Sequence, residues 1–195
     1  MRTLCIDTAY KMLVVGVIED GRILFDYQME APKRQSESLF KVLSNLSKEY
    51  NFDFLSIDSI CFTIGPGSYT GTRIALTLAK TLALTKTLTI YTISTLKLYS
   101  NMQTNTAVLM DARAERTYFG VYNNGKVVVE DCIVPLSELD LKDYNLIGDL
   151  YLIGKEASYP DIMDAFLNSI SVWEPVADIA SLTPKYLKET EAYKR

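Results

Sequence analysis

The sequence repeats its own opening, and this internal repeat limits the fold more than any other feature. Residues 4–23 align without a gap on residues 108–127. The matching pairs are Asp7 with Asp111, Gly16 with Gly120, Val17 with Val121, Gly21 with Gly125 and Arg22 with Lys126. So many matches in register favour a duplicated unit, which predicts a fold of two related lobes.

Each copy has the pattern of three short strands. An apolar strand ends in an acidic residue, a second strand follows, and a tight glycine turn leads into a third. The turns are Asp20-Gly21 in the first copy and Asn124-Gly125 in the second, and both dipeptides are typical of β-hairpins. We expect one lobe at residues 1–100 and a second at 106–195, joined by a polar linker.

Helical patterns alternate with further strands in both lobes. The elements expected in the first lobe are strands at 3–6, 13–18 and 23–25, a helix at 37–50, a strand at 59–63, a helix at 72–84, a strand at 88–93 and a short helix from Ser94. The elements expected after the second copy are a helix at 136–144, a strand at 151–153, a helix at 159–167, a strand at 170–173 and helical turns at 176–182. The alternation predicts an α/β fold.

The absence of histidine excludes several kinds of chemistry at once. With no histidine in the chain, a Ser-His-Asp triad, a Cys-His pair and any histidine-containing metal site are ruled out. Three cysteines, Cys5, Cys61 and Cys132, lie far apart without CxxC spacing, so we interpret them as reduced thiols. We expect neither a metal nor a cofactor.

Net charge and hydropathy limit the kinds of partner that we expect for this chain. The formal net charge of −4 argues against nucleic-acid binding by this chain alone, since such binding depends on clustered Lys and Arg. No apolar run approaches the ~20 residues that span a bilayer, and we expect no signal peptide before the first strand. The expectation is a cytoplasmic protein without a membrane partner.

A glycine-rich loop at residues 64–73 joins a buried strand to a helix. The sequence Gly65-Pro66-Gly67-Ser68 has the Pro and Gly positions of a type II turn, and Ser68 or Thr70 can cap the helix. The start of a helix suits an anion such as a phosphate, although no Gly-Lys-Ser/Thr follows as in a Walker A loop. A structural turn and a ligand loop are equally supported; the candidate residues are Gly65, Gly67, Ser68, Thr70, Gly71 and Arg73.

The helix after this loop is apolar over more of its surface than one core contact needs. Its apolar residues spread over roughly 200°, against the ~100° of an ordinary amphipathic helix. Ala75, Ala79 and Ala83 recur at every fourth position, so another backbone could approach along that row. We favour an outward-facing row that a partner covers; the alternative is a helix enclosed by its own sheet and a neighbouring helix.

Charged side chains near the strand ends are the candidates for ligand contacts in a cleft between the lobes. Asp7 and Asp111 could hold a hydrated metal near a phosphate, but we favour a capping role for each. Arg73 could clamp a phosphate or a partner's carboxylate, with an internal pair as the equal alternative. Arg113 and Glu115 could line the cleft, with a solvated face as the simpler interpretation.

Together these features resemble a known fold and, more closely, one family. Two lobes of βββαβα type, each with an Asp at the end of its first strand, are similar to the actin, hexokinase and Hsp70 superfamily (ASKHA fold), here with an abbreviated second lobe. The chain as a whole resembles the TsaB (YeaZ) family. The motifs are Ile6-Asp7-Thr8, Gln35-Ser36-Glu37, the glycine loop ending in Arg73, Ser94-Thr95-Leu96, Asp111-Ala112-Arg113 with Glu115 and Tyr118, and Pro184-Lys185-Tyr186-Leu187-Lys188. Gln35 stands where that family usually has His.

The resemblance implies a non-catalytic subunit that binds and activates a TsaD-like threonylcarbamoyltransferase acting on adenosine 37 of tRNA. It implies that a TsaE-like ATPase joins the pair, and that tRNA is met only through the complex; a homodimer of the isolated chain stays open. The residues expected at the TsaD-like interface are Leu39, Phe40, Leu43, Ala75, Leu78, Ala79, Leu82 and Ala83. The alternative function is a small ASKHA-type nucleotide-binding phosphotransferase or ATPase that uses the glycine loop and Asp7.

Overall fold

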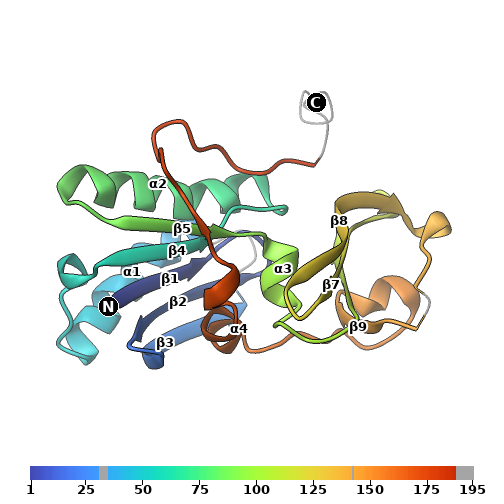
Figure 1. Ribbon diagram of the computed structural model, residues 1–195, viewed down its shortest axis with the longest axis horizontal. Helices are drawn as coiled ribbons and strands as arrows, with labels where there is room; N and C mark the ends of the chain where they lie inside the picture. Colours follow the sequence, from blue (N-terminus) through green and yellow to red (C-terminus); the bar gives the residue numbers. More distant parts are fainter. Residues whose placement is uncertain (31–34, 142, 188–195) are drawn as a thin grey trace.

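Two β-sheets organise the computed structural model, which describes residues 1–30, 35–141 and 143–187. Figure 1 shows them side by side, with α3 between them. The larger sheet has the strand order β10-β5-β4-β1-β2-β3, and the smaller has the order β8-β7-β6-β9. Lys188, the last residue of the closing motif, lies outside the described residues.

The larger sheet begins as an antiparallel meander and continues with parallel strands. The meander strands are β1 (Arg2–Asp7), β2 (Met12–Glu19) and β3 (Arg22–Glu30), and the parallel strands next to β1 are β4 (Ser59–Thr63) and β5 (Thr89–Ile93). Helices α1 (Gln35–Glu49) and α2 (Tyr69–Thr85) make the crossovers. A meander followed by two parallel crossovers is the expected ASKHA arrangement, and the helices at 37–50 and 72–84 are confirmed.

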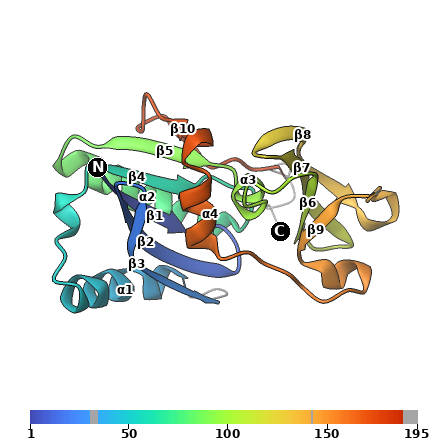
Figure 2. The same ribbon diagram turned by 60° about the horizontal axis from the view of Figure 1, so that its bottom comes forward.

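The two faces of the larger sheet are covered by different helices. Side chains alternate along β1, so Leu4 and Ile6 pack with α1 and α2, while Cys5 faces the opposite core. The covers of that opposite face are α3 (Thr95–Tyr99) and α4 (Ile162–Asn168). Figure 2 shows α4 against β2 and β3. This second core also includes Val108 and Met110 of the smaller sheet, so the two sheets share it.

The smaller sheet repeats the meander, but fewer helices pack around it. Its strands are β6 (Thr106–Asp111), β7 (Arg116–Asn123), β8 (Lys126–Pro135) and the parallel β9 (Asn145–Gly148). The 3-10 turns are η1 (Phe54–Ser56), η2 (Leu136–Glu138), η3 (Leu150–Ile153) and η4 (Ile170–Val172), and β10 (Glu174–Pro175) pairs with β5 of the larger sheet. The second lobe is therefore abbreviated, as expected; its boundaries at 106–195 stay a prediction.

The repeat is visible in both hairpins, but the strand registers differ by one residue. Asp20-Gly21 and Asn124-Gly125 all have positive φ, as a two-residue hairpin turn requires. Asp7 pairs with Val14, whereas Asp111 pairs with Thr117 instead of Tyr118. The chain therefore has one residue fewer between Asp111 and its partner Thr117 than between Asp7 and its partner Val14. It has one residue more between Thr117 and the second hairpin turn than between Val14 and the first. The two differences cancel, which is why the sequences align without a gap.

Three elements expected after the second copy are wrong. The expected helix at 136–144 is only the turn η2, and the expected strands at 151–153 and 170–173 are η3 and η4. The strand that pairs with β6 is β9, just before η3. Short apolar runs do not separate strands from turns, and here Gly148 and Gly154 end their segments with positive φ.

Candidate functional site

The alanine row of α2 faces inward, so the outward-facing row expected from the sequence is wrong. Ala75 and Ala79 are 0% exposed and belong to the core between α1, α2 and the larger sheet. Leu39 and Leu78 are buried in the same core. Small side chains along the contact let α2 lie close to the sheet, which is the physical reason for the row.

The chain itself covers part of the surplus apolar surface of α2. Residues 176–187, which we call the C-terminal strap, run past α2 toward the smaller sheet (Figure 1). Val176, Ile179 and Leu182 of the strap pack against the core of α1 and α2. Lys80 Nζ on α2 donates a hydrogen bond to the carbonyl of Ala180 at 2.9 Å. Part of the apolar width of α2 is therefore explained by a contact within the chain, and not by a partner.

An apolar surface still remains on the outer side of the helix pair. Phe40 on α1 is 65% exposed. Leu43, Leu82 and Ala83 are half-buried and contact the edge of the core. Of the eight residues expected at an interface, these four have surface left for a partner.

The glycine loop is folded against its own chain. A cis peptide bond joins Gly65 to Pro66, and Gly65 has a φ of 106°. Gly67 does not have the positive φ that a type II turn requires, so the expected type II turn is wrong. A Cβ at Gly67 would lie 2.1 Å from the carbonyl oxygen of Ala9, and one at Gly71 would lie 2.1 Å from that of Thr8. The glycines permit this close backbone contact.

Caps and neighbours occupy the polar groups of the loop. Ser68 is the N-cap of α2 and accepts a hydrogen bond from the Gly71 N–H, as predicted. The Ser68 N–H donates to the Ala9 carbonyl at 2.7 Å. The strap crosses the other side, where the Lys185 N–H donates to the Ile64 carbonyl at 2.8 Å. These contacts support the structural turn among the two alternatives for the loop. Thr70, the other candidate cap, is exposed on the first turn of α2.

Arg73 makes the internal contact that was one of its two alternatives. Its Nε donates to the Tyr186 hydroxyl at 2.9 Å, and its guanidinium lies 4.0 Å from the centre of the Tyr69 ring. The rings of Tyr69 and Tyr186 stack with centres 5.3 Å apart. Arg73 thus ties the start of α2 to the strap.

The two aspartates of the repeat have different surroundings. Asp7 is 0% exposed and accepts hydrogen bonds from the Ala9 N–H at 2.9 Å, from Thr63 Oγ1 at 2.6 Å and from the Tyr99 hydroxyl at 2.9 Å. Burial raises the pKa of Asp7, and these hydrogen bonds oppose the rise. Both oxygens of this carboxylate are used within the fold.

Asp111 is half-buried and has neighbours of its own. Its Oδ1 accepts a hydrogen bond from the Arg113 N–H at 2.6 Å, and its Oδ2 accepts one from the Tyr151 hydroxyl at 3.5 Å. Arg113 and Glu115 are exposed on the following connection, where residues 113–115 all have positive φ. Each aspartate caps its own connection, in line with the favoured interpretation.

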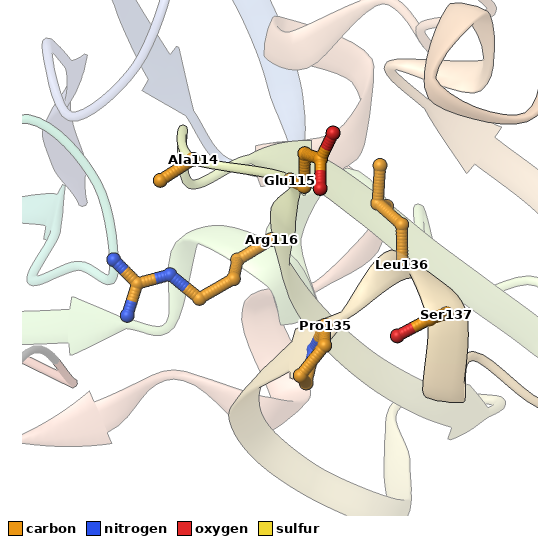
Figure 3. A pocket seen from close by; sticks show the side chains of 6 residues that line it. All are labelled: Ala114, Glu115, Arg116, Pro135, Leu136 and Ser137. Carbon is orange, nitrogen blue, oxygen red and sulfur yellow. The ribbon is translucent and has the colours of Figure 1, made fainter.

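An open hollow lies beside this connection. It has a volume of about 430 Å³ and is lined by Ala114, Glu115, Arg116, Pro135, Leu136 and Ser137. Figure 3 shows the guanidinium of Arg116 directed away from the carboxylate of Glu115, so the two do not converge on one point. Glu115 therefore borders a surface hollow, while Arg113 is absent from its lining.

Asp149, which the sequence did not single out, is the centre of a hydrogen-bonded cluster. Its side chain is 0% exposed and accepts hydrogen bonds from Tyr10, Lys11 and Tyr159. Tyr10 and Lys11 follow β1, so this cluster joins the two sheets. The sequence does hold a signal, because an Asp directly after a strand parallel to β6 lies at the same sheet edge as Asp111. The strand expected at 151–153 hides this signal, since it puts Asp149 before the strand instead of after it.

Within residues 1–30, 35–141 and 143–187, no three or more Cys, Asp or Glu side chains come together as metal ligands would. No helix in the same ranges combines the length and apolarity needed to cross a membrane.

Comparisons with known proteins identify the family. Residues 29–151 match the family model described as TsaD: tRNA N6-adenosine threonylcarbamoyltransferase. The chain is 28% identical to the tRNA threonylcarbamoyladenosine biosynthesis protein TsaB of Bacillus subtilis (strain 168), over 98% of this chain and 96% of that protein. It is 27% identical to the protein of the same name from Escherichia coli (strain K12), over 63% of this chain and 55% of that protein.

Solved structures share the fold. YeaZ from Pseudomonas aeruginosa has a TM-score of 0.77 at 20% identity, over 95% of this chain and 99% of that one. A structure described as an uncharacterized protein with similarity to peptidase YEAZ, also from Pseudomonas aeruginosa, has a TM-score of 0.78 at 21% identity, over 96% and 99% of the two chains. With the family model spanning more than half of its length and TsaB proteins among its relatives, this chain belongs to the TsaD family and, within it, to the TsaB (YeaZ) proteins.

Proposed function

We propose that this chain acts in the biosynthesis of threonylcarbamoyladenosine in tRNA, as a non-catalytic subunit that binds and activates a TsaD-like transferase. The pathway is taken from the names of the TsaB relatives and of the family model. On this proposal the complex forms in the cytoplasm, a TsaE-like ATPase joins it, and adenosine 37 of the tRNA is met only through the complex.

The observation that carries the non-catalytic role is the internal use of Asp7, Arg73 and the loop glycines, on which the alternative phosphotransferase or ATPase would depend. Asp7 is enclosed with three hydrogen-bond donors, Arg73 is bonded to Tyr186, and the loop glycines lie against Thr8 and Ala9. Groups held in this way stabilise the fold. They are not presented to a nucleotide or a tRNA, so the chemistry is assigned to the partner.

The proposed docking face is the outer side of α1 and its boundary with α2. An exposed aromatic side chain beside half-buried leucines is typical of an interface anchor, and Phe40 with Leu43 and Leu82 has this form. The occupant is a TsaD-like subunit, because the family resemblance implies that its equivalent helices pack against α1 and α2. Ala75 and Ala79 then support the face from inside.

The test is binding to the TsaD-type protein of the same organism, measured by calorimetry, with Phe40→Asp as the variant. We expect Phe40→Asp to weaken binding at least about tenfold while the fold is kept, because the side chain is exposed. Val128→Asp on β8 is the matched control, since Val128 is 55% exposed on the other sheet.

Two results would contradict the proposal. Unchanged affinity in Phe40→Asp would remove this face as the docking surface. Magnesium-dependent ATP turnover by the purified chain alone would favour the phosphotransferase or ATPase instead. Light scattering of the isolated chain decides whether the same face also forms a homodimer, since Phe40→Asp should then convert dimer to monomer.

A further inference from the structure

An ammonium group of the chain itself lies among tyrosine rings between the two sheets. Lys11 Nζ is 4.8 Å from the ring centre of Tyr151, 5.4 Å from that of Tyr10 and 5.9 Å from that of Tyr159. The same Nζ donates to Asp149 Oδ1 at 2.6 Å. Nζ also lies 3.4 Å from the Tyr151 hydroxyl and 3.3 Å from the Tyr159 hydroxyl, so it meets Tyr159 at the hydroxyl end of the ring. A carboxylate, two hydroxyl oxygens and neighbouring tyrosine rings therefore surround one charge, and aromatic rings within about 6 Å attract a cation.

Asp149 forms the closed end of this cage. Besides Lys11, it accepts hydrogen bonds from the hydroxyls of Tyr10 and Tyr159 and from the backbone N–H of Asp111 at 2.7 Å. Burial alone would raise the pKa of Asp149, but these donors hold it below its ordinary value. Lys11 supplies the one full positive charge among the four donors.

We propose that this cage is a binding site for an alkylammonium group, and that Lys11 occupies it as a built-in ligand that fastens the β1–β2 connection to the smaller sheet. A carboxylate, hydroxyl oxygens and nearby aromatic rings together suit an alkylammonium ion, which donates hydrogen bonds and is attracted by the rings. The cage is open on one side, since the side chain of Lys11 is 33% exposed and Tyr151 is 48% exposed. Shortening Lys11 would leave a vacant site that an amine from solution can reach.

The fastened connection also holds the start of α2. Thr8 Oγ1 donates to the Gly71 carbonyl at 2.7 Å, and the Ala9 carbonyl accepts from the Ser68 N–H at 2.7 Å. Release of Lys11 should therefore loosen the first turn of α2 together with the connection. This inference holds whether or not the chain binds a TsaD-like subunit.

The test is chemical rescue of Lys11→Ala with ethylammonium chloride, read by thermal unfolding and hydrogen exchange. We expect the variant to have a lower Tm, and ethylammonium to raise it by about 3 °C, because a ligand bound only to the folded state stabilises that state. Exchange at residues 8–11 and 69–72 should rise at least about tenfold and fall again with the amine. Lys155→Ala, which alters an exposed lysine, and the wild type should show no rescue.

Several results would overturn the proposal. One is a Tm that ethylammonium leaves unchanged; another is an equal rise in Lys155→Ala or in the double variant Lys11→Ala/Asp149→Asn. If Lys11→Ala does not fold, acetylation of the wild-type protein decides. An occupied cage predicts that Lys11 reacts at least about tenfold more slowly than Lys155, as a raised lysine pKa requires, and equal rates would refute occupancy.

Discussion

The two sheets begin with matching sequence and end with different cover. The larger sheet has α1 and α2 on one face and α3 and α4 on the other. The smaller sheet shares one core with the larger and closes its other face with a small cluster around Phe119 and Leu150. The difference shows that duplicated strands do not bring duplicated helices.

The second half of the chain explains the imbalance. Helix α4 and strand β10 follow the smaller sheet in sequence but pack on the larger one, and the strap then lies along α2. Residues that would complete a second lobe therefore complete the first. The larger sheet should accordingly tolerate least change, and the two copies of each repeated residue should differ in their contribution to stability.

The largest expected effect is that of Ala79→Arg in the core of the larger sheet. A guanidinium would have neither room nor a partner where Ala79 is 0% exposed, so we expect a loss of about 5 kcal/mol in the free energy of unfolding. Circular dichroism during urea unfolding measures it. Thr77→Arg, at an exposed position of the same helix, should change the free energy by less than about 0.5 kcal/mol. A folded, stable Ala79→Arg would place the row at the surface after all.

The next effect compares the repeated aspartates. Asp7→Ala leaves the Ala9 N–H and the hydroxyls of Thr63 and Tyr99 without their buried acceptor, and should cost about 3 kcal/mol. Asp111→Ala removes a half-buried cap and should cost about 1 kcal/mol. Urea unfolding of both variants checks the ratio. Equal losses would mean that Asp7 contributes no more to the free energy of unfolding than Asp111 does, despite the deeper cover of the larger sheet.

The pH dependence of Asp7→Asn sharpens the same comparison. Because burial raises the pKa of Asp7, the folded state binds its proton more tightly than the unfolded state does. The wild type therefore gains stability from Asp7 at low pH, and loses it as the pH rises from the ordinary value of 3.8 through the raised pKa. Asn does not titrate, so the stability of Asp7→Asn relative to the wild type should increase between about pH 3 and pH 7. A difference that is constant over this range would contradict the raised pKa.

Local patterns were sufficient to predict the helices and strands between β1 and α3. The meander, both hairpin turns, the helices at 37–50 and 72–84 and the Ser68 cap all depend on residues close in sequence. The repeat and these elements together carried the resemblance to the ASKHA arrangement.

Long-range contacts account for what the sequence did not predict. The apolar width of α2 predicted that something covers the helix, but no local pattern could identify the strap as part of that cover. The strap is held by a hydrogen bond between Lys80 and Ala180, which are far apart in the chain. The inward direction of Ala79 depends on how closely α2 approaches the sheet. Asp149 was missed because a short apolar run at 151–153 was assigned as the strand, although β9 lies just before it.

The smallest expected effect compares the glycines of the two hairpin turns. Gly21 and Gly125 have φ of 76° and 74°, so an alanine at either position should cost about 1 kcal/mol in backbone strain. A Cβ at Gly21 would have nothing within 4 Å, whereas one at Gly125 would lie 2.4 Å from Met102 Sδ. Gly125→Ala should therefore cost about 1 kcal/mol more than Gly21→Ala, as measured by urea unfolding. Met102 is flexible, so equal losses would mean that it moves aside freely and that the second turn is held no more tightly than the first.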